Sequence, residues 1–263
     1  MHIEALGYRA TAPSAGAAAA AVTGDSLAVK NNIGEKSPRI IAGMMKNQTA
    51  GYHQLTWPSG HDTTRGLRLR VPAAEPDNRI PLGLGPHVQA QEALTVQIAG
   101  SAVAGDIEQG CLLMHYPNLP GISQRLIDWD DLQRRIEQLL TVEFTLALDT
   151  TGDWSGSELI TAESDLLRAN RDYAVLGSVV SAGECTALSI KGPDTGNVRV
   201  GMHGNTEDAE FAANFFPILS RAYRAPFIPV ISSGNKASTY LEGLTDENGT
   251  DVVGSLFLAL LKR

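Results

Sequence analysis

The chain carries short runs of alternating hydrophobic and polar residues, separated by turn residues. In the clearest run, Leu67, Leu69 and Val71 point to one side. Arg68 and Arg70 lie between them and point to the other. Apolar residues at every second position are the pattern of a half-buried β-strand. Similar or wholly apolar runs predict further strands at residues 26–30, 39–46, 52–57, 80–84, 94–98, 111–116, 142–148, 173–181, 186–191, 197–202, 227–231, 239–244 and 252–261.

The spacing of apolar residues changes after Asp128. They recur at steps of three and four: Trp129, Leu132, Ile136 and Leu139. This spacing predicts an amphipathic helix over about residues 128–140, with Asp128 as a suitable N-cap. The helix separates two all-β regions, and we expect it to be their only link and to bury its apolar face against both.

A second helical pattern runs from Glu207 to about Arg224. Pro217 interrupts it, because proline lacks the backbone N–H and clashes with the preceding turn. Two short helices or one kinked helix are therefore predicted in this segment.

The two β-regions resemble each other, and paired features keep their order along the chain. The pairs are Gly43 with Gly177, Ala50-Gly51 with Ala182-Gly183, Arg68 with Arg199, Ile80-Pro81 with Ile228-Pro229, and Gly110 with Gly254. The main break in the spacing coincides with the second helical pattern. This predicts a duplicated β-unit with a helical insertion in its second copy. Two units of about 100 residues, each with about eight short strands, suit β-sandwiches or jelly rolls.

These patterns divide the chain into four segments. Residues 1–22 are rich in Ala, Gly, Ser and Thr, and we expect a flexible N-terminal arm that orders only against a partner. Residues 23–120 form the first predicted jelly roll. Residues 121–140 contain the linker helix, and residues 141–263 form the second jelly roll.

Composition narrows the class of protein. The chain has 263 residues and a formal net charge of −8. Because binding to phosphates depends on positive charge, we expect no direct sequence-specific contact with nucleic acid. Cys111 and Cys185 lie far apart in apolar runs, so we expect two buried free thiols. No apolar run approaches a membrane span or a signal-peptide core, and we expect an intracellular product.

The doubled β-unit resembles the double jelly-roll major capsid proteins of tailless icosahedral viruses. The resemblance covers about residues 23–263. It rests on the architecture, on the Ile-Pro…Gly…apolar-strand pattern that closes each half, and on the helical insertion before that pattern in the second half. It implies two upright barrels per subunit, homotrimers of pseudo-hexagonal outline, and self-assembly into the shell of a virion in the host cytoplasm. The implied partners are other copies of the chain, with minor capsid or penton proteins and an internal membrane as further candidates.

Little in the sequence indicates catalysis, and we expect neither enzymatic activity nor a metal or cofactor. Two-domain cupins hold a metal with a His-x-His cluster, which the segment around His53 and His61 does not supply. The acidic segment from Asp246 to Asp251 lacks the full spacing of a calcium loop. The alternatives to a capsid protein are a two-domain β-sandwich hydrolase, a carbohydrate-binding protein and a viral spike module.

Arg65, Arg68 and Arg70 are the basic residues most suited to an assembly role. On an alternating strand they solvate an outer face in the simplest interpretation. The functional alternative is a charge seam between subunits, facing some of the many Asp and Glu residues. With the four apolar residues of the predicted helix, they are the candidate assembly residues.

Overall fold

The chain folds into β-sheets over most of its length. The computed structural model describes residues 1–12, 20–34, 36–60, 66–73, 76–101, 103–149, 153–181, 185–204, 209–245 and 250–262. Within these residues the strands form four sheets and the helices are short. The all-β class predicted from the alternating pattern is therefore confirmed.

The first half of the chain builds two sheets that face each other, which we call the first sandwich. One sheet has the order β3-β1-β9-β4-β7 and the other β2-β8-β5-β6. The strands are β1 (His2–Thr11), β2 (Ala20–Ala21), β3 (Thr23–Gly24), β4 (Arg39–Lys46), β5 (Gly51–Thr56), β6 (Leu67–Val71), β7 (Asp77–Asn78), β8 (Thr95–Ala99) and β9 (Ile107–Tyr116). Tyr8, Leu112 and Met114 from one sheet share a core with Leu55 and Val96 from the other.

The second half builds the second sandwich. Its sheets have the orders β10-β16-β13-β18-β11 and β12-β17-β14-β15. The strands are β10 (Leu126–Ile127), β11 (Ile136–Leu148), β12 (Trp154–Leu159), β13 (Asp172–Val180), β14 (Cys185–Lys191), β15 (Val200–His203), β16 (Ile228–Ser232), β17 (Tyr240–Thr245) and β18 (Thr250–Leu261). Short 3₁₀ helices cover Pro193–Thr195 (η1) and Ser233–Ser238 (η2).

Strand order is the same in the two sandwiches once the two-residue edge strands β3 and β10 are set aside. β1-β9-β4-β7 corresponds to β11-β18-β13-β16, and β2-β8-β5-β6 corresponds to β12-β17-β14-β15. Two of the three glycine pairs noted in the sequence fall on equivalent strands, and Gly183 of the third pair lies outside the described residues. Gly43 and Gly177 lie in β4 and β13, and Gly110 and Gly254 lie in β9 and β18. The regular repetition of the fold supports the predicted duplication.

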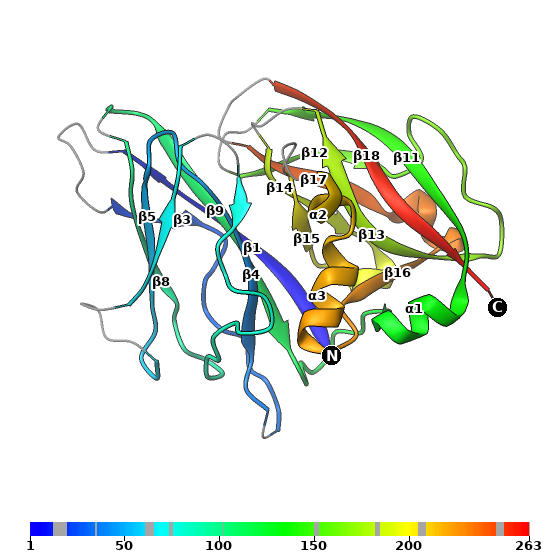
Figure 1. Cartoon of the computed structure of the whole chain (residues 1–263), viewed down its shortest axis with the longest axis horizontal. Coiled ribbons are helices and arrows are strands. Elements are labelled where there is room, and N and C mark those ends of the chain that lie inside the picture. The colour runs from blue at the N-terminus through cyan, green and yellow to red at the C-terminus, as the bar shows by residue number, and fades with distance from the viewer. Residues whose placement is uncertain are drawn as a thin grey trace.

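The two sandwiches stack, so that their sheets lie in successive layers (Figure 1). β1, β4 and β9 of the first contact β14 and β15 of the second. Ile3, Ala5 and Cys111 consequently share a core with residues of the second sandwich, while Leu6 and Tyr8 face the first core. The sheet built around β9 is therefore buried on both faces.

The prediction of a flexible arm over residues 1–22 is wrong for its first half. His2–Thr11 form β1, which pairs with β9 along its whole length, and residues 13–19 lie outside the described residues. The small residues of this segment suggested a flexible arm. They are needed because one face of β1 packs closely against the second sandwich. The first sandwich accordingly begins at β1 and not at residue 23.

The predicted helix over residues 128–140 is too long. α1 covers Trp129–Arg135, with the side chain of Asp128 accepting a hydrogen bond from the N–H of Asp131 at 2.7 Å. The chain then enters β11 at Ile136, because residues from there onward pair with β18. The expectation that this helix is the only link between the halves is also wrong, since the sandwiches share a core.

The second predicted helical segment forms two short helices, as expected. They are α2 (Ala209–Ala213) and α3 (Phe215–Tyr223), and the break falls at Asn214. Pro217 lies in the first turn of α3, where its missing N–H costs no helical hydrogen bond. Both helices pack on β13. A Cβ on Gly177 would stand 2.0 Å from the carbonyl oxygen of Ala212, so only glycine admits α2 this close.

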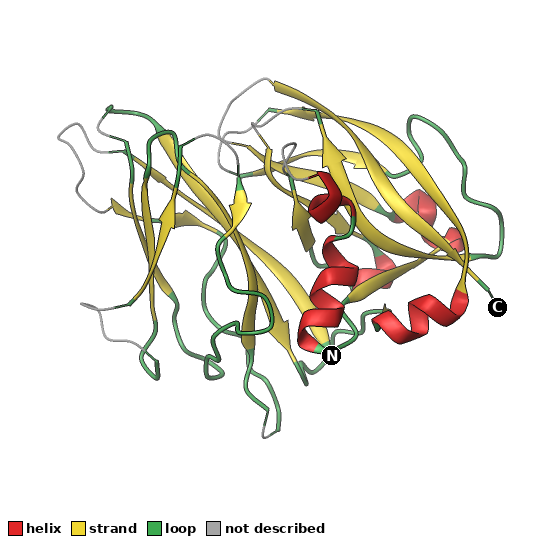
Figure 2. Ribbon diagram, viewed as in Figure 1, coloured by secondary structure: helices red, strands yellow, loops and turns green. Residues whose placement is uncertain are grey.

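Figure 2 shows all described helices in or beside the second sandwich. α3 also reaches the first sandwich, because a Cβ on Gly83 would contact the carbonyl oxygen of Ala222 at 2.9 Å. The helical insertion is thus packed between the two halves and helps to hold them together.

Candidate assembly surfaces

The junction between the sandwiches shows how one such unit packs on another. Its centre is lined by small residues: a Cβ on Gly201 of β15 would lie 2.7 Å from the Cβ of Ala5 in β1. The N–H of Ala5 donates a hydrogen bond to the carbonyl oxygen of Arg199 at 2.8 Å. Close approach of two backbones explains why β1 is rich in alanine and glycine.

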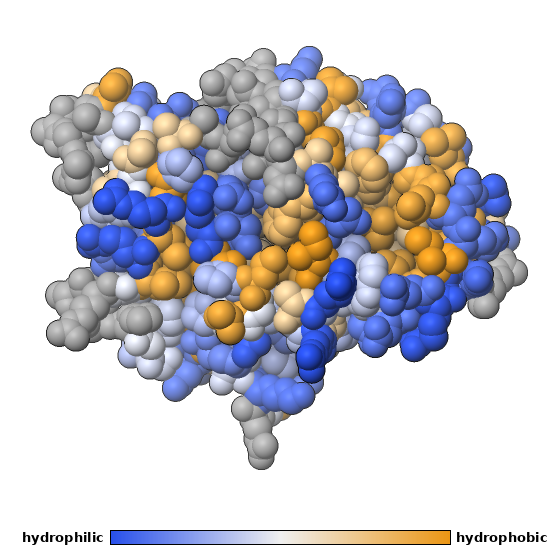
Figure 3. Space-filling model, viewed as in Figure 1, coloured by the Kyte–Doolittle hydropathy of each residue, from blue (hydrophilic) through white to orange (hydrophobic). Residues whose placement is uncertain are grey.

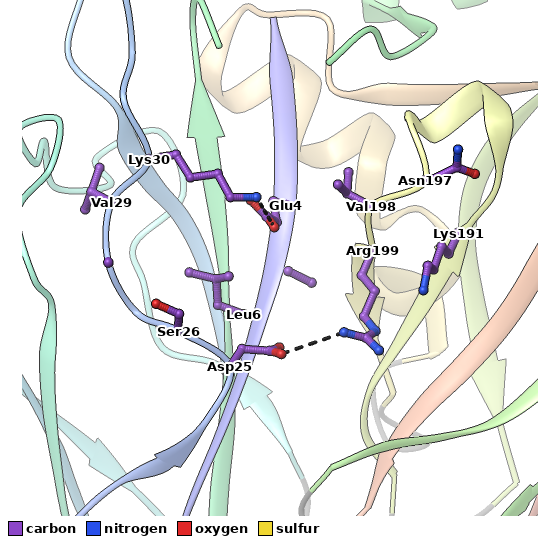
Figure 4. A pocket seen from close by; sticks show the side chains of 12 residues that line it. Glu4, Leu6, Asp25, Ser26, Val29, Lys30, Lys191, Asn197, Val198 and Arg199 are labelled. Carbon is purple, nitrogen blue, oxygen red and sulfur yellow. Dashed lines mark hydrogen bonds and ion pairs between the residues drawn. The ribbon is translucent and has the colours of Figure 1, made fainter. Parts of the chain in front are cut away.

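A charged cleft of about 480 Å³ lies beside this junction (Figure 4). Nε of Arg199 donates a hydrogen bond to the carboxylate of Glu242 at 2.5 Å. Another nitrogen of the same guanidinium lies 3.7 Å from the carboxylate of Asp25 in the first sandwich. Asp25 also accepts hydrogen bonds from the N–H of Gly7 at 2.8 Å and from the indole of Trp154 at 2.9 Å. This network joins strands of both halves and fixes their relative position.

A second ion pair lies on the first-sandwich wall of the cleft. The ammonium of Lys30 donates to Glu4 at 2.6 Å. Burial disfavours the charged form of Glu4, but the nearby His2 ring and the hydrogen bond from Lys30 lower its pKa below the usual range. Arg199 and Lys30 therefore both pair with carboxylates of the chain. The charged groups of this cleft serve to hold the structure together.

A buried polar network lies inside the first sandwich and involves His53. Its ring is fully buried, with Nδ1 at 2.9 Å from the Tyr8 hydroxyl and Nε2 at 2.7 Å from the Asn47 amide. Burial lowers the pKa of His53 to about 3, so the ring is neutral at pH 7. In the orientation that satisfies its neighbours, the Asn47 amide also donates to Glu108. The network positions strands and has no access to solvent.

The structure separates the four apolar residues predicted for the linker helix. Leu132 is buried in the core, whereas Trp129 is half-buried and lies beside Arg221 of α3. Ile136 begins β11 and packs partly against the same core. Leu139 lies in β11 and is 63% exposed. Only Leu132 is fully buried, and Leu139 belongs to a strand face.

Two of the three predicted basic residues lie on the outer face of the first sandwich. Arg68 and Arg70 of β6 are exposed, and Arg65 lies outside the described residues. Arg68 donates to the Gln54 side chain at 2.6 and 3.0 Å and stacks over Tyr52 at 4.2 Å. We call the surface formed by Tyr52, Gln54, Arg68 and Arg70 the arginine face.

Hydrophobic residues are exposed at the opposite end of the stack, on the outer face of β11 and β18. Figure 3 shows hydrophobic side chains gathered over these strands. Leu139 and Val253 are 63% and 47% exposed, and Phe257 is half-buried opposite Thr141. Glu143 on the same face is exposed. We call the surface formed by Leu139, Thr141, Glu143, Val253 and Phe257 the open sheet face.

The open sheet face has a counterpart within the chain. β11 and β18 are equivalent to β1 and β9 by strand order. The outer face of β1 and β9 is covered by β14 and β15, which are equivalent to β5 and β6. The same kind of face is therefore covered in one sandwich and exposed in the other. Sequence reasoning did not find Val253 and Phe257, because the run of apolar residues in β18 does not indicate which of them face outward.

The described residues contain no group of histidine, cysteine, aspartate and glutamate side chains arranged to hold a metal ion. No helix in the described part of the chain is long and apolar enough to span a bilayer. The chain matches no protein-family model, and no curated protein is similar to it in sequence. Its function must therefore be argued from the geometry of its own surfaces.

Proposed function

We propose that the chain is a double jelly roll and serves as the major capsid protein of an icosahedral virion. The strand order repeated in both sandwiches supports the jelly-roll topology, because it pairs the first strand of each unit with the last and the second with the seventh. In this proposal the chain forms a homotrimeric capsomer of pseudo-hexagonal outline. It is a structural protein without enzymatic activity or cofactor.

The proposal rests on two equivalent sheet faces. The outer face of β1 and β9 is covered within the chain, whereas the open sheet face of β11 and β18 is exposed. The junction inside the chain is a head-to-tail contact between two similar units. Head-to-tail contacts close into rings when the rotation per step fits. Repeating the internal contact between chains would place the open sheet face of one copy against the arginine face of the next. Three copies then give a ring of six sandwiches.

The two faces are chemically suited to each other. The open sheet face offers the exposed side chains of Leu139 and Val253 together with the carboxylate of Glu143. The arginine face offers two exposed guanidinium groups and the ring of Tyr52. Arginine and aromatic residues are enriched in protein interfaces, because they combine apolar contact with hydrogen bonding.

The test is the mass and shape of the purified full chain. Light scattering should give a trimer, and electron micrographs should show particles with a hexagonal outline or closed shells. Leu139→Glu places a charge in the proposed contact and should shift the chain to monomers. Val103→Glu, at an equally exposed residue in a loop of the first sandwich, is the matched control and should leave the trimer intact.

A chain that stays monomeric at all concentrations would overturn the proposal and favour a hydrolase, a carbohydrate-binding protein or a spike module. A trimer that Leu139→Glu and Val103→Glu disturb equally would refute the assignment of the open sheet face.

A further inference from the structure

A second cavity lies where the first sandwich meets the end of α3, away from the charged cleft. It measures about 390 Å³, within the range of small-molecule sites. Arg39 at the start of β4 and His115 near the end of β9 line it from the first half. Tyr223 and Phe227 line it from the second. A ligand bound there would touch both halves of the chain.

The cations of this cavity have no acidic counterpart among the described residues. Arg39 lies in no described ion pair, and its Nε donates to Nε2 of His87 at 3.0 Å. It also lies 5.7 Å from the centre of the Tyr223 ring. Lys36 adds a second cation to the lining, and the described residues of the lining include no carboxylate. The charge here therefore differs from the paired charges of the cleft.

His115 adds a buried polar group to the same wall. Its side chain is 9% exposed and packs edge-on against Phe227, with ring centres 4.8 Å apart. Its Nε2 has no hydrogen-bond partner among the described groups. Burial lowers the pKa of His115 to about 4, and the positive charges of the N-terminus and Arg39 act in the same direction. A nearby anion would favour protonation of this ring.

Apolar and aromatic side chains form most of the remaining lining, together with Ser37. Phe227 is fully buried, and Tyr223, Pro117 and Ala225 also line the cavity. A ligand that fits must combine a negatively charged group with a small apolar body, because guanidinium and ammonium groups stand beside aromatic rings.

We propose that this cavity binds a small organic carboxylate, with the carboxylate facing Arg39 and Lys36 and the apolar body against Tyr223 and Phe227. The inference does not depend on the proposed function, since the cavity lies within one chain. Arg39 supplies a planar fork that matches a carboxylate, and such charge-assisted pairs are among the stronger hydrogen bonds. Its occupancy would stabilise the contact between the halves.

The experiment is calorimetric titration of the full chain with hexanoate and benzoate. Hexanol, benzyl alcohol and inorganic phosphate are the comparison probes. Both carboxylates should bind at least about tenfold more tightly than the matching alcohols and than phosphate. Alcohols that bind as tightly as the acids would overturn the role of the charge. Phosphate that binds equally well would overturn the role of the apolar walls, and failure of either carboxylate to bind would overturn the site.

Two variants place the binding in this cavity. Arg39→Gln should weaken hexanoate binding by about tenfold or more, the loss expected for a charge-assisted hydrogen bond. Lys36→Gln changes an exposed residue, leaves the fold intact and should weaken binding by a smaller factor. Arg134→Gln, at an exposed arginine of α1, is the control and should bind normally. Unchanged binding in both cavity variants would refute the proposed location.

Discussion

The hydroxyl of Tyr223 donates a hydrogen bond to the backbone carbonyl oxygen of Ile41, 3.0 Å away. It also accepts one from the N–H of Gly85 at 3.0 Å. Tyr223 ends α3, whereas Ile41 and Gly85 belong to the first half. One side chain of the helical insertion thus satisfies two backbone groups of the other sandwich.

Tyr223→Phe should lower the free energy of unfolding by about 1–3 kcal/mol, because it leaves backbone groups without their partner. Denaturant melts of the isolated subunit measure this change. Tyr240→Phe is the control, at a tyrosine that is 37% exposed, and should cost no more than about 0.5 kcal/mol. Equal effects of the two variants would mean that the Tyr223 hydroxyl does not join the halves.

The close approach of Ala5 and Gly201 makes a second prediction. Gly201→Val would force the sandwiches apart and should destabilise the chain by about 1–3 kcal/mol. The same change made together with Ala5→Gly should cost less than the sum of the two single changes, because the facing methyl is gone. Strict additivity in thermal or denaturant melts would show that the two residues are not in contact.

Leu132 and Leu139 were predicted on one helix face, but the structure places them in different environments. Leu132→Ala should cost about 2–5 kcal/mol, since it empties a buried site. Leu139→Ala should change the stability of the isolated subunit by no more than about 0.5 kcal/mol. Similar losses in the two variants would contradict the end of α1 at Arg135.

The buried ring of His53 gives the chain a pH-dependent stability. Burial lowers its pKa to about 3 from 6.5 in the unfolded chain. As pH falls below 6.5, His53 becomes protonated in the unfolded state but stays neutral in the folded state. The folded chain therefore progressively loses the stability that it has above that pH. His53→Gln removes this titration. The difference in unfolding free energy between the two proteins should therefore shrink as pH falls from about 6.5 to about 4.

Melts at several pH values measure that difference. The other histidines are present in both proteins, so their contribution cancels. A difference that stays constant over this pH range would show that His53 titrates alike in the folded and unfolded chain.

The sequence was sufficient to predict strands whose two faces meet different surroundings. Leu67–Val71, which alternates cleanly, forms β6 with the predicted bounds. It was insufficient for β1, because the face of that strand that packs on the second sandwich needs small residues, which gave the segment the composition of a flexible arm. Composition alone suggested a mobile segment there.

The end of α1 shows a different limit. Trp129, Leu132, Ile136 and Leu139 have helical spacing, yet pairing with β18 starts at Ile136. The spacing of apolar residues within a short segment carries no information about a partner strand more than a hundred residues away. The carboxylate cavity was beyond prediction for the same reason, since Arg39 and Tyr223 meet only through the tertiary fold.

The sheet buried on both faces has a consequence for how the protein folds and how it could have evolved. Expressed alone, the first half would present the apolar outer side chains of β1, β4 and β9 to water, and the separate half should aggregate. The complete chain should melt in a single cooperative transition despite its two sandwiches. The two sandwiches therefore cannot evolve as independent units: neither can be deleted, exchanged or shuffled into another protein without the other.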